Sequence, residues 1–176
     1  MMSTLKVSSD SNPDNSFVIS ALGFRGRNQE FPKTIKEITE AMKEANQKNV
    51  LIVGCQYHKN QGASEPNWFF RFFLQYIIYH PLLDHNRMFN FLESNFGKGD
   101  DQDRNEINYL YTCWPGIGNG APTPNKKMQI EYGTDVIKER GLRRARVTTG
   151  DVAKFLFDQI DSGDYKRGEV SICHAN

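Results

Sequence analysis

The chain has 176 residues, which suits one domain with its own core and is short for two. Its 22 lysines and arginines nearly balance its 21 aspartates and glutamates, so a net charge of +1 excludes any overall attraction to nucleic acid or to an anionic membrane. No apolar run is long enough to cross a bilayer, and no basic-then-apolar signal segment opens the sequence. We therefore expect a cytoplasmic protein without a membrane or nucleic-acid partner.

Cysteine usage agrees with this expectation. Three cysteines are an odd number, and no two of them are spaced as a CxxC pair. Neither a disulfide framework nor a zinc finger is therefore indicated, and we expect reduced thiols. The sequence identifies no cofactor, and its spacing predicts no metal site, because metal ligands usually occur as close pairs.

The first part of the chain predicts a strand, a helix and a second strand. Residues 1–16 form a polar leader, and 17–23 are a candidate strand that ends in glycine. In the helix that follows, Thr34 and Glu37 match a capping box, and apolar residues recur at helical spacing. The continuously apolar stretch 49–55 is then a buried strand, parallel to the first.

The segment 65–80 predicts a helix that is apolar almost all round. Between Trp68 and Tyr79 only Arg71 and Gln75 are strongly polar. Such a helix must be buried on several sides, either in the centre of the core or partly by a second copy of the chain. Pro81 is expected to end it, and Asp84 to cap the helix that follows.

The second half of the chain predicts further strands around a long loop and one more helix. The helix begins at a capping Thr149 and has Gly163 past its end. The strands are a half-buried 107–113, a short 128–132, an arginine-rich edge strand 142–148 and a last strand 169–173. Together the elements predict an α/β fold, in which 17–176 form a single three-layer domain with a mainly parallel, doubly wound sheet of four to five strands.

Each cysteine is the last residue of a predicted strand: Cys55, Cys113 and Cys173. If these strands are parallel, the three thiols lie at the carboxyl edge of the sheet, where open α/β sheets bind ligands. Other polar residues just beyond strand ends join them there: Arg25, Gln56, His58 and His174. The alternative is packing, because free cysteine is among the most buried residue types.

A glycine-rich loop follows the strand 107–113, and two lysines follow the loop: Gly116, Gly118, Gly120, Lys126 and Lys127. Glycine-rich backbone after a strand can bind a phosphate. The loop lacks the Gly-Lys-Ser/Thr ending of a P-loop, and Pro122 and Pro124 stand where a dinucleotide-binding helix would start. An irregular loop rich in turns is the structural alternative.

Three functions are compatible with these patterns. The first is a binding domain whose carboxyl-edge crevice takes a small anionic or nucleotide-like ligand, through Arg25 and the glycine loop with its lysines. The second is a cysteine-dependent hydrolase or transferase that uses Cys173 or Cys55 with His58 as base. The third is a self-assembling structural protein, a homo-oligomer formed through the aromatic helix 65–80 and ordered termini.

Overall fold

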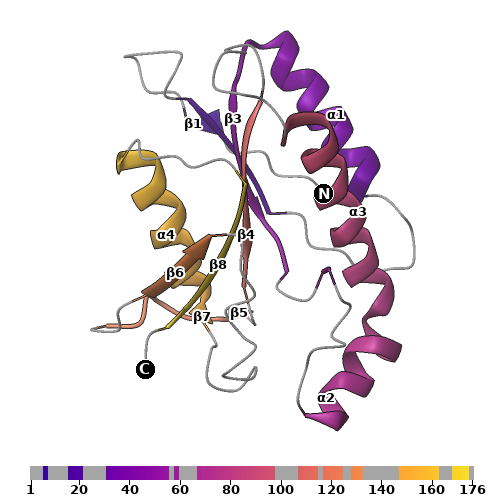
Figure 1. The fold of residues 1–176 in the computed structure, drawn as a ribbon. Coiled ribbons are helices and arrows are strands. Elements are labelled where there is room, and N and C mark those ends of the chain that lie inside the picture. Colours follow the sequence, from indigo (N-terminus) through magenta and orange to yellow (C-terminus); the bar gives the residue numbers. More distant parts are fainter. Residues whose placement is uncertain are drawn as a thin grey trace.

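In a computed structural model, residues 6–7, 16–21, 31–55, 58–59, 67–97, 107–114, 117–124, 128–132, 147–162 and 168–174 are described. They form a sheet of six strands with helices on both faces (Figure 1). The order across the sheet is β1-β2-β3-β4-β8-β6. The strands are β1 (Lys6–Val7), β2 (Phe17–Ser20), β3 (Asn49–Val53), β4 (Asn108–Cys113), β6 (Met128–Tyr132) and β8 (Gly168–His174).

The centre of the sheet is parallel, as the sequence predicts. Strands β2, β3, β4 and β8 are parallel neighbours, whereas β1 and β6 add antiparallel edges. The sheet has six strands and not four to five, because Lys6–Val7 of the predicted leader pair with β2. The predicted edge strand 142–148 is described only at β7 (Val147–Thr148), which pairs with β5 (Ile117–Gly118) in a separate small sheet.

Helices cover both faces, which confirms the three-layer, doubly wound prediction. Helices α1 (Phe31–Glu44) and α3 (Tyr79–Phe96) lie on one side of the sheet and α4 (Thr149–Ser162) on the other (Figure 1). Val50 and Ile52 of β3 pack toward α1 and α3, and Leu51 packs toward α4. Burial on both faces explains why β3 is continuously apolar instead of alternating.

The aromatic segment is helical but divided. It consists of α2 (Trp68–Phe72), capped by the side chain of Asn67, and a π-helical turn η2 (Phe73–Ile77). The helix breaks at Ile78, and Pro81 does not end it but lies in the first turn of α3, where proline is tolerated. Asp84 is consequently inside α3, and the prediction that it caps a helix is wrong.

The aromatic segment is not buried in the chain's own core. Leu74 is its one buried residue, whereas Trp68 and Tyr76 are each 71% exposed and Ile77 is 63% exposed. The interpretation as a central core helix is therefore wrong, and burial by a second copy stays a prediction. None of the described helices has the length and apolar content to cross a membrane.

Exchange of Trp68 and Tyr76 for serine is expected to weaken any self-association of the chain at least tenfold, because exposed aromatic clusters dominate protein interfaces. The free energy of unfolding of the monomer should change by less than about 0.5 kcal/mol, since both side chains are exposed. Multi-angle light scattering over a wide concentration range measures the association. Phe157→Ser, at an exposed position of α4, is the control. A wild-type chain that stays monomeric throughout would end the self-assembly hypothesis.

Candidate functional site

The path of the chain changes sides between β3 and β4. After β3 it continues to α2 and α3 on one face of the sheet, and after β4 it continues to the α4 side (Figure 1). There the segment after β5 contacts the start of α4, where the amide of Gly150 donates to the carbonyl of Gly120 at 3.0 Å. Strand order does not reverse here, since β2, β3, β4 and β8 are neighbours in chain order, but the connections after β3 and β4 leave toward opposite faces. Open α/β sheets bind ligands between such diverging connections, outside the carboxyl ends of the two strands.

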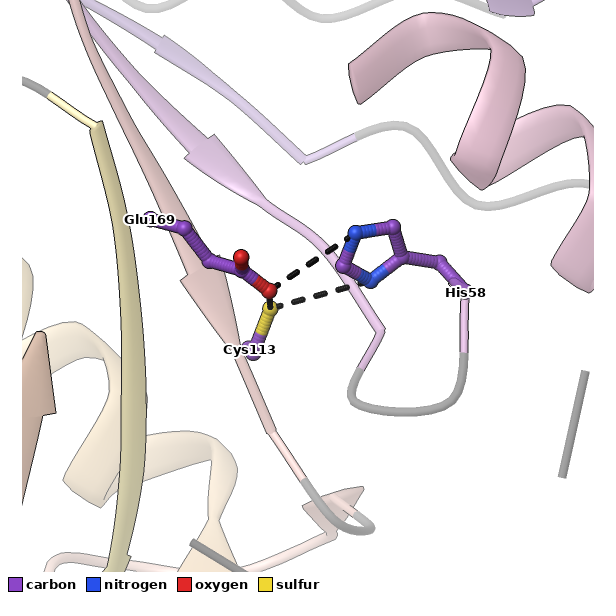
Figure 2. Close-up of side chains that lie close together, drawn as sticks. All are labelled: His58, Cys113 and Glu169. Carbon is purple, nitrogen blue, oxygen red and sulfur yellow. Dashed lines mark hydrogen bonds and ion pairs between the residues drawn. The ribbon is translucent and has the colours of Figure 1, made fainter. Parts of the chain in front are cut away.

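Three side chains with different chemistry meet at this end of the sheet: His58 after β3, Cys113 at the end of β4, and Glu169 of β8 (Figure 2). The thiol of Cys113 donates to Oε1 of Glu169 at 3.2 Å, and Nε2 of His58 lies 3.7 Å from the same oxygen. Sγ of Cys113 is 3.9 Å from Nδ1 of His58. His58 and Cys113 are fully buried and the carboxylate is nearly so, so this cluster lies inside the protein and not on its surface.

The turn after β3 fixes the imidazole of His58. Its backbone amide donates to the carbonyl of Cys55 at 3.3 Å, and ring Nδ1 lies 2.7 Å from the same oxygen. Because a carbonyl only accepts, Nδ1 carries a proton and Nε2 is the nitrogen that faces Glu169. The ring packs against Phe89 and Tyr111, with centroid distances of 5.0 and 4.9 Å. The position, rotation and tautomer of the His58 imidazole are thus all determined by Cys55, Phe89 and Tyr111.

Strand register brings Glu169 to the cluster. Glu169 pairs with Tyr111 in the parallel ladder, while Val170 and Ile172 of the same strand pack toward α4. Alternation along the strand therefore turns Glu169 toward the face that carries Cys113. Its other oxygen, Oε2, forms an ion pair with Lys59, whose side chain is half-exposed. The lysine supplies the countercharge that a nearly buried carboxylate requires.

Burial raises the pKa of the Cys113 thiol well above its usual range, and the neighbouring carboxylate of Glu169 raises it further. The thiol is consequently protonated at neutral pH, as its hydrogen bond to Glu169 requires. Reactive cysteines have the opposite property, a lowered pKa in an electropositive and partly exposed position. The geometry around Cys113 alone therefore does not prepare a thiolate nucleophile.

Behind the cluster lies a second polar pair, Tyr111 and His85. The Tyr111 hydroxyl is 3.0 Å from Nδ1 of His85, and the amide of Cys55 donates to it at 3.4 Å. Burial, and to a smaller extent an electrostatic effect of His58, lowers the pKa of His85 to about 4, and burial raises the pKa of Tyr111. Both groups are therefore neutral at neutral pH, so the phenol can donate its proton to the imidazole.

On the opposite face, the carboxylate of Asp151 joins the loop after β5 to the start of α4. It accepts from the amides of Thr123 and Thr148 at 2.7 and 2.8 Å and from Nε2 of His174 at 3.0 Å. Burial works to raise the pKa of Asp151, but the hydrogen bonds from Thr123 and Thr148 outweigh it and hold that pKa well below its usual range. Because the Asp151 amide donates to the Thr148 hydroxyl, the helix cap is Thr148 and not Thr149.

This contact bears on the predicted phosphate loop. The amide of Gly120 donates to the hydroxyl of Thr149, and its carbonyl accepts from Gly150. The loop is thus bound to the beginning of α4, where Asp151 already supplies a negative charge to the helix. A phosphate at this helix end would have to displace the carboxylate of the chain itself.

The structure separates the predicted site residues into two groups. One group lies near β3 and β4 and comprises Cys55, His58 and Cys113; the other lies on the α4 side and comprises Gly118, Gly120 and His174. Cys173 follows Ile172 on β8, two residues beyond the partner of Cys113 in the ladder. Use of His58 as the base of Cys173 or Cys55 stays a prediction. The remaining predicted residues lie outside the described part of the chain: Arg25, Gln56, Gly116, Lys126 and Lys127.

Sequence reasoning missed Glu169 and Lys59. Glu169 opens a strand of otherwise apolar and small residues, Val170 to Cys173, and a charge in such a strand could have been noticed as a group that needs a partner. Lys59 directly follows His58 and could have been named as that partner. The pairing itself depends on the register of β8 against β4, which no local pattern encodes.

Comparison with known proteins supports the fold. No family profile and no curated protein matches the sequence. Among solved structures, a Lactobacillus casei protein has a TM-score of 0.65 at 16% identity, over 95% of this chain and 72% of its own. A candidate NADH-flavin reductase from Streptococcus pneumoniae has a TM-score of 0.63 at 16% identity, over 90% and 71% of the two chains.

A third similar structure contains a bound nucleotide. It is a wide-type short-chain dehydrogenase/reductase from Veillonella parvula in complex with NADP, with a TM-score of 0.58 and 16% identity over 94% of this chain and 70% of its own. At such identities the similarity concerns the backbone arrangement. This chain has the Rossmann-like α/β fold of these reductases.

Proposed function

We propose that this chain is a binding domain for a nucleotide-like ligand, which lies across the carboxyl ends of β3 and β4. The observation that carries the proposal is that the connections diverge: the one after β3 lies on the α3 side of the sheet, and the one after β4 lies on the α4 side. In doubly wound sheets a ligand inserts between two such diverging connections. The Rossmann-like fold supports the same location, and the Veillonella complex suggests NADP as a probe.

Lys59 supports an anionic ligand. It lies in the turn after β3, with its ammonium group near the Phe89 ring at 4.8 Å from the centroid and paired with Glu169. Half of its side chain is exposed, so a phosphate can approach the cation from solvent. Arg25, Lys126 and Lys127 extend this proposal as further phosphate-binding residues. Phosphate binding at the start of α4 is not part of the proposal, because the carboxylate of Asp151 already occupies that position.

Exchange of Lys59 for glutamine is expected to weaken a phosphate-bearing ligand about tenfold, which corresponds to one charge-assisted hydrogen bond of about 1.4 kcal/mol. The titration uses NADP, NAD, ATP and inorganic pyrophosphate in turn, followed by calorimetry or thermal shift. Lys154→Gln is the matched control, because Lys154 is also half-exposed and also paired with a carboxylate, but lies on α4.

Two results would contradict the proposal. One is that none of the four probes raises the melting temperature, since a ligand at a hundred times its dissociation constant adds about 2.7 kcal/mol of stability. The other is that Lys154→Gln weakens binding as much as Lys59→Gln does, which would indicate a non-specific electrostatic effect instead of a site beside β3.

A further inference from the structure

We infer that His58, Cys113 and Glu169 form a site for one divalent transition-metal ion of the zinc type. Each residue offers one ligand atom, and the three atoms lie within 4.8 Å of one another. The site goes beyond the proposed nucleotide binding and does not depend on it.

The distances are close to those of a coordinated ion. Zinc bonds of about 2.3 Å to sulfur and about 2.0–2.1 Å to nitrogen or oxygen place tetrahedral ligand atoms about 3.3–3.6 Å apart. The observed separations are 3.2 Å between the thiol and Oε1 of Glu169, and 3.7 Å between this oxygen and Nε2 of His58. The sulfur of Cys113 lies 3.9 Å from Nδ1 of His58, the nitrogen that faces the Cys55 carbonyl, so coordination through Nε2 requires the thiol and the imidazole to shift toward a common ion.

The ligand chemistry selects the class of ion. A thiolate, an imidazole and a carboxylate together suit zinc, whereas magnesium and calcium prefer oxygen ligands alone. Binding releases the thiol proton to solvent, and the ion then takes the place of that proton between sulfur and carboxylate. Three protein ligands leave the fourth position of a tetrahedral ion to a water or to a bound molecule.

Neighbouring groups already hold the ligands in a metal-binding orientation. Nδ1 of His58 lies 2.7 Å from the carbonyl of Cys55, and Nε2 is the nitrogen directed toward Oε1 of Glu169. Metal-binding histidines typically show this backbone hydrogen bond on the other nitrogen. Lys59 engages Oε2 of Glu169, so that Oε1 faces the thiol and the imidazole.

The three ligands also come from three separate segments, as Figure 2 shows: the turn after β3, the end of β4 and the start of β8. An ion would join these segments at the carboxyl end of the sheet. Full burial of the imidazole and the thiol would protect it from exchange with solvent.

The test is a cobalt titration of the full, chelator-treated chain under reducing conditions. We expect one Co²⁺ per chain, with the visible bands of a tetrahedral ion and a near-ultraviolet thiolate-to-cobalt band, and stoichiometric displacement by Zn²⁺. Cys113→Ser should abolish the thiolate band and weaken Zn²⁺ binding at least about 100-fold, since loss of a supporting group alone costs 10- to 100-fold. Cys173→Ser, at an equally buried cysteine, is the matched control and should behave as wild type.

The inference is overturned if the wild-type chain gives no thiolate band, or if the band disappears in Cys173→Ser or Cys55→Ser and persists in Cys113→Ser. Circular dichroism establishes that each variant is folded. Should Cys113→Ser fail to fold, Glu169→Gln decides, because it keeps the shape of the side chain and removes the ligand charge. A Zn²⁺ affinity for Glu169→Gln within threefold of wild type would then exclude the site.

Discussion

Replacement of Asp151 by asparagine is expected to lower the free energy of unfolding by about 3 kcal/mol. The carboxylate accepts hydrogen bonds from Thr123, Thr148 and His174, and its side chain is 95% buried. An asparagine would turn an NH₂ group toward these donors and leave several of them without an acceptor. Urea unfolding followed by circular dichroism measures the loss.

The matched control is Asp158→Asn on the same helix. Asp158 is half-exposed and pairs with Lys154 at the i,i+4 spacing of a surface ion pair. Such pairs contribute about 0.3–0.5 kcal/mol, so the control should lose less than about 0.5 kcal/mol. Equal losses for the two variants would mean that the buried network around Asp151 does not hold the start of α4.

The same carboxylate predicts a pH dependence. The pKa of Asp151 in the folded chain is held below the ordinary value of about 3.9, so folding favours the ionised form. This stabilisation is complete above pH of about 4–5, and it is lost as the pH falls further toward the folded pKa. The difference in stability between wild type and Asp151→Asn should therefore shrink below pH of about 4, by up to about 1.4 kcal/mol per pH unit. A difference that stays constant to pH of about 2 would contradict the lowered pKa.

Exchange of Gly54 for alanine is expected to cost about 3 kcal/mol, or roughly 6–12 °C in Tm for a domain of this size. An added Cβ would overlap the ring of Tyr111. That ring cannot turn aside, because it is fully buried against His58 and Phe89 and its hydroxyl is bound to His85. The alanine therefore forces β3 away from β4 at their carboxyl ends. Differential scanning calorimetry measures the shift.

Gly118→Ala provides the comparison for the same substitution. A Cβ at Gly118 would meet its nearest neighbour, the carbonyl oxygen of Val147, at 3.9 Å, which is an ordinary contact. Its stability should stay the same or rise by up to about 1 kcal/mol, because alanine restricts the unfolded chain. If Gly54→Ala were as stable as Gly118→Ala, a Cβ at position 54 would fit beside the Tyr111 ring. That result would contradict the overlap expected from the structure.

The sequence predicted the sheet well because the relevant information is local. The apolar run that contains Leu51 is buried on both faces, and the alternation around Tyr109 to Cys113 gave a second strand. That second strand is buried on both faces as well, so the prediction that it is half-buried was wrong. Two strands joined by a helix also imply a parallel pair. The short strand Lys6–Val7 was missed, because two residues in a polar leader carry no periodicity and their strand is defined by its pairing with β2.

The aromatic segment shows the limit of this reasoning. Its composition indicates burial, but composition does not determine which surfaces remain for it to cover. The face of the sheet next to it already carries α1 and α3, whose side chains Ile35, Met88 and Leu92 fill the core. Trp68 and Tyr76 therefore point outward, and their exposure follows from tertiary packing.

The candidate site was predicted in location and only in part in composition. Cys113 ends one predicted strand and His58 follows another, and these two positions identified the carboxyl edge of the sheet. The partner of both, Glu169, depends on how β8 aligns with β4, and the burial that raises the pKa of the Cys113 thiol depends on the surrounding side chains. Neither property can be derived from spacing along the chain.

Amide hydrogen exchange with and without saturating NADP locates the proposed nucleotide site, because it reports which segments a ligand protects. The proposal predicts increased protection in peptides that cover 53–59 and 112–118, which follow β3 and β4, and little change at 31–44 or on the outer surface of α4. Protection at the opposite end of the sheet, around 48–50 and 107–109, would contradict a site at the carboxyl ends of β3 and β4. The proposal would equally be contradicted if NADP left exchange unchanged over the whole chain.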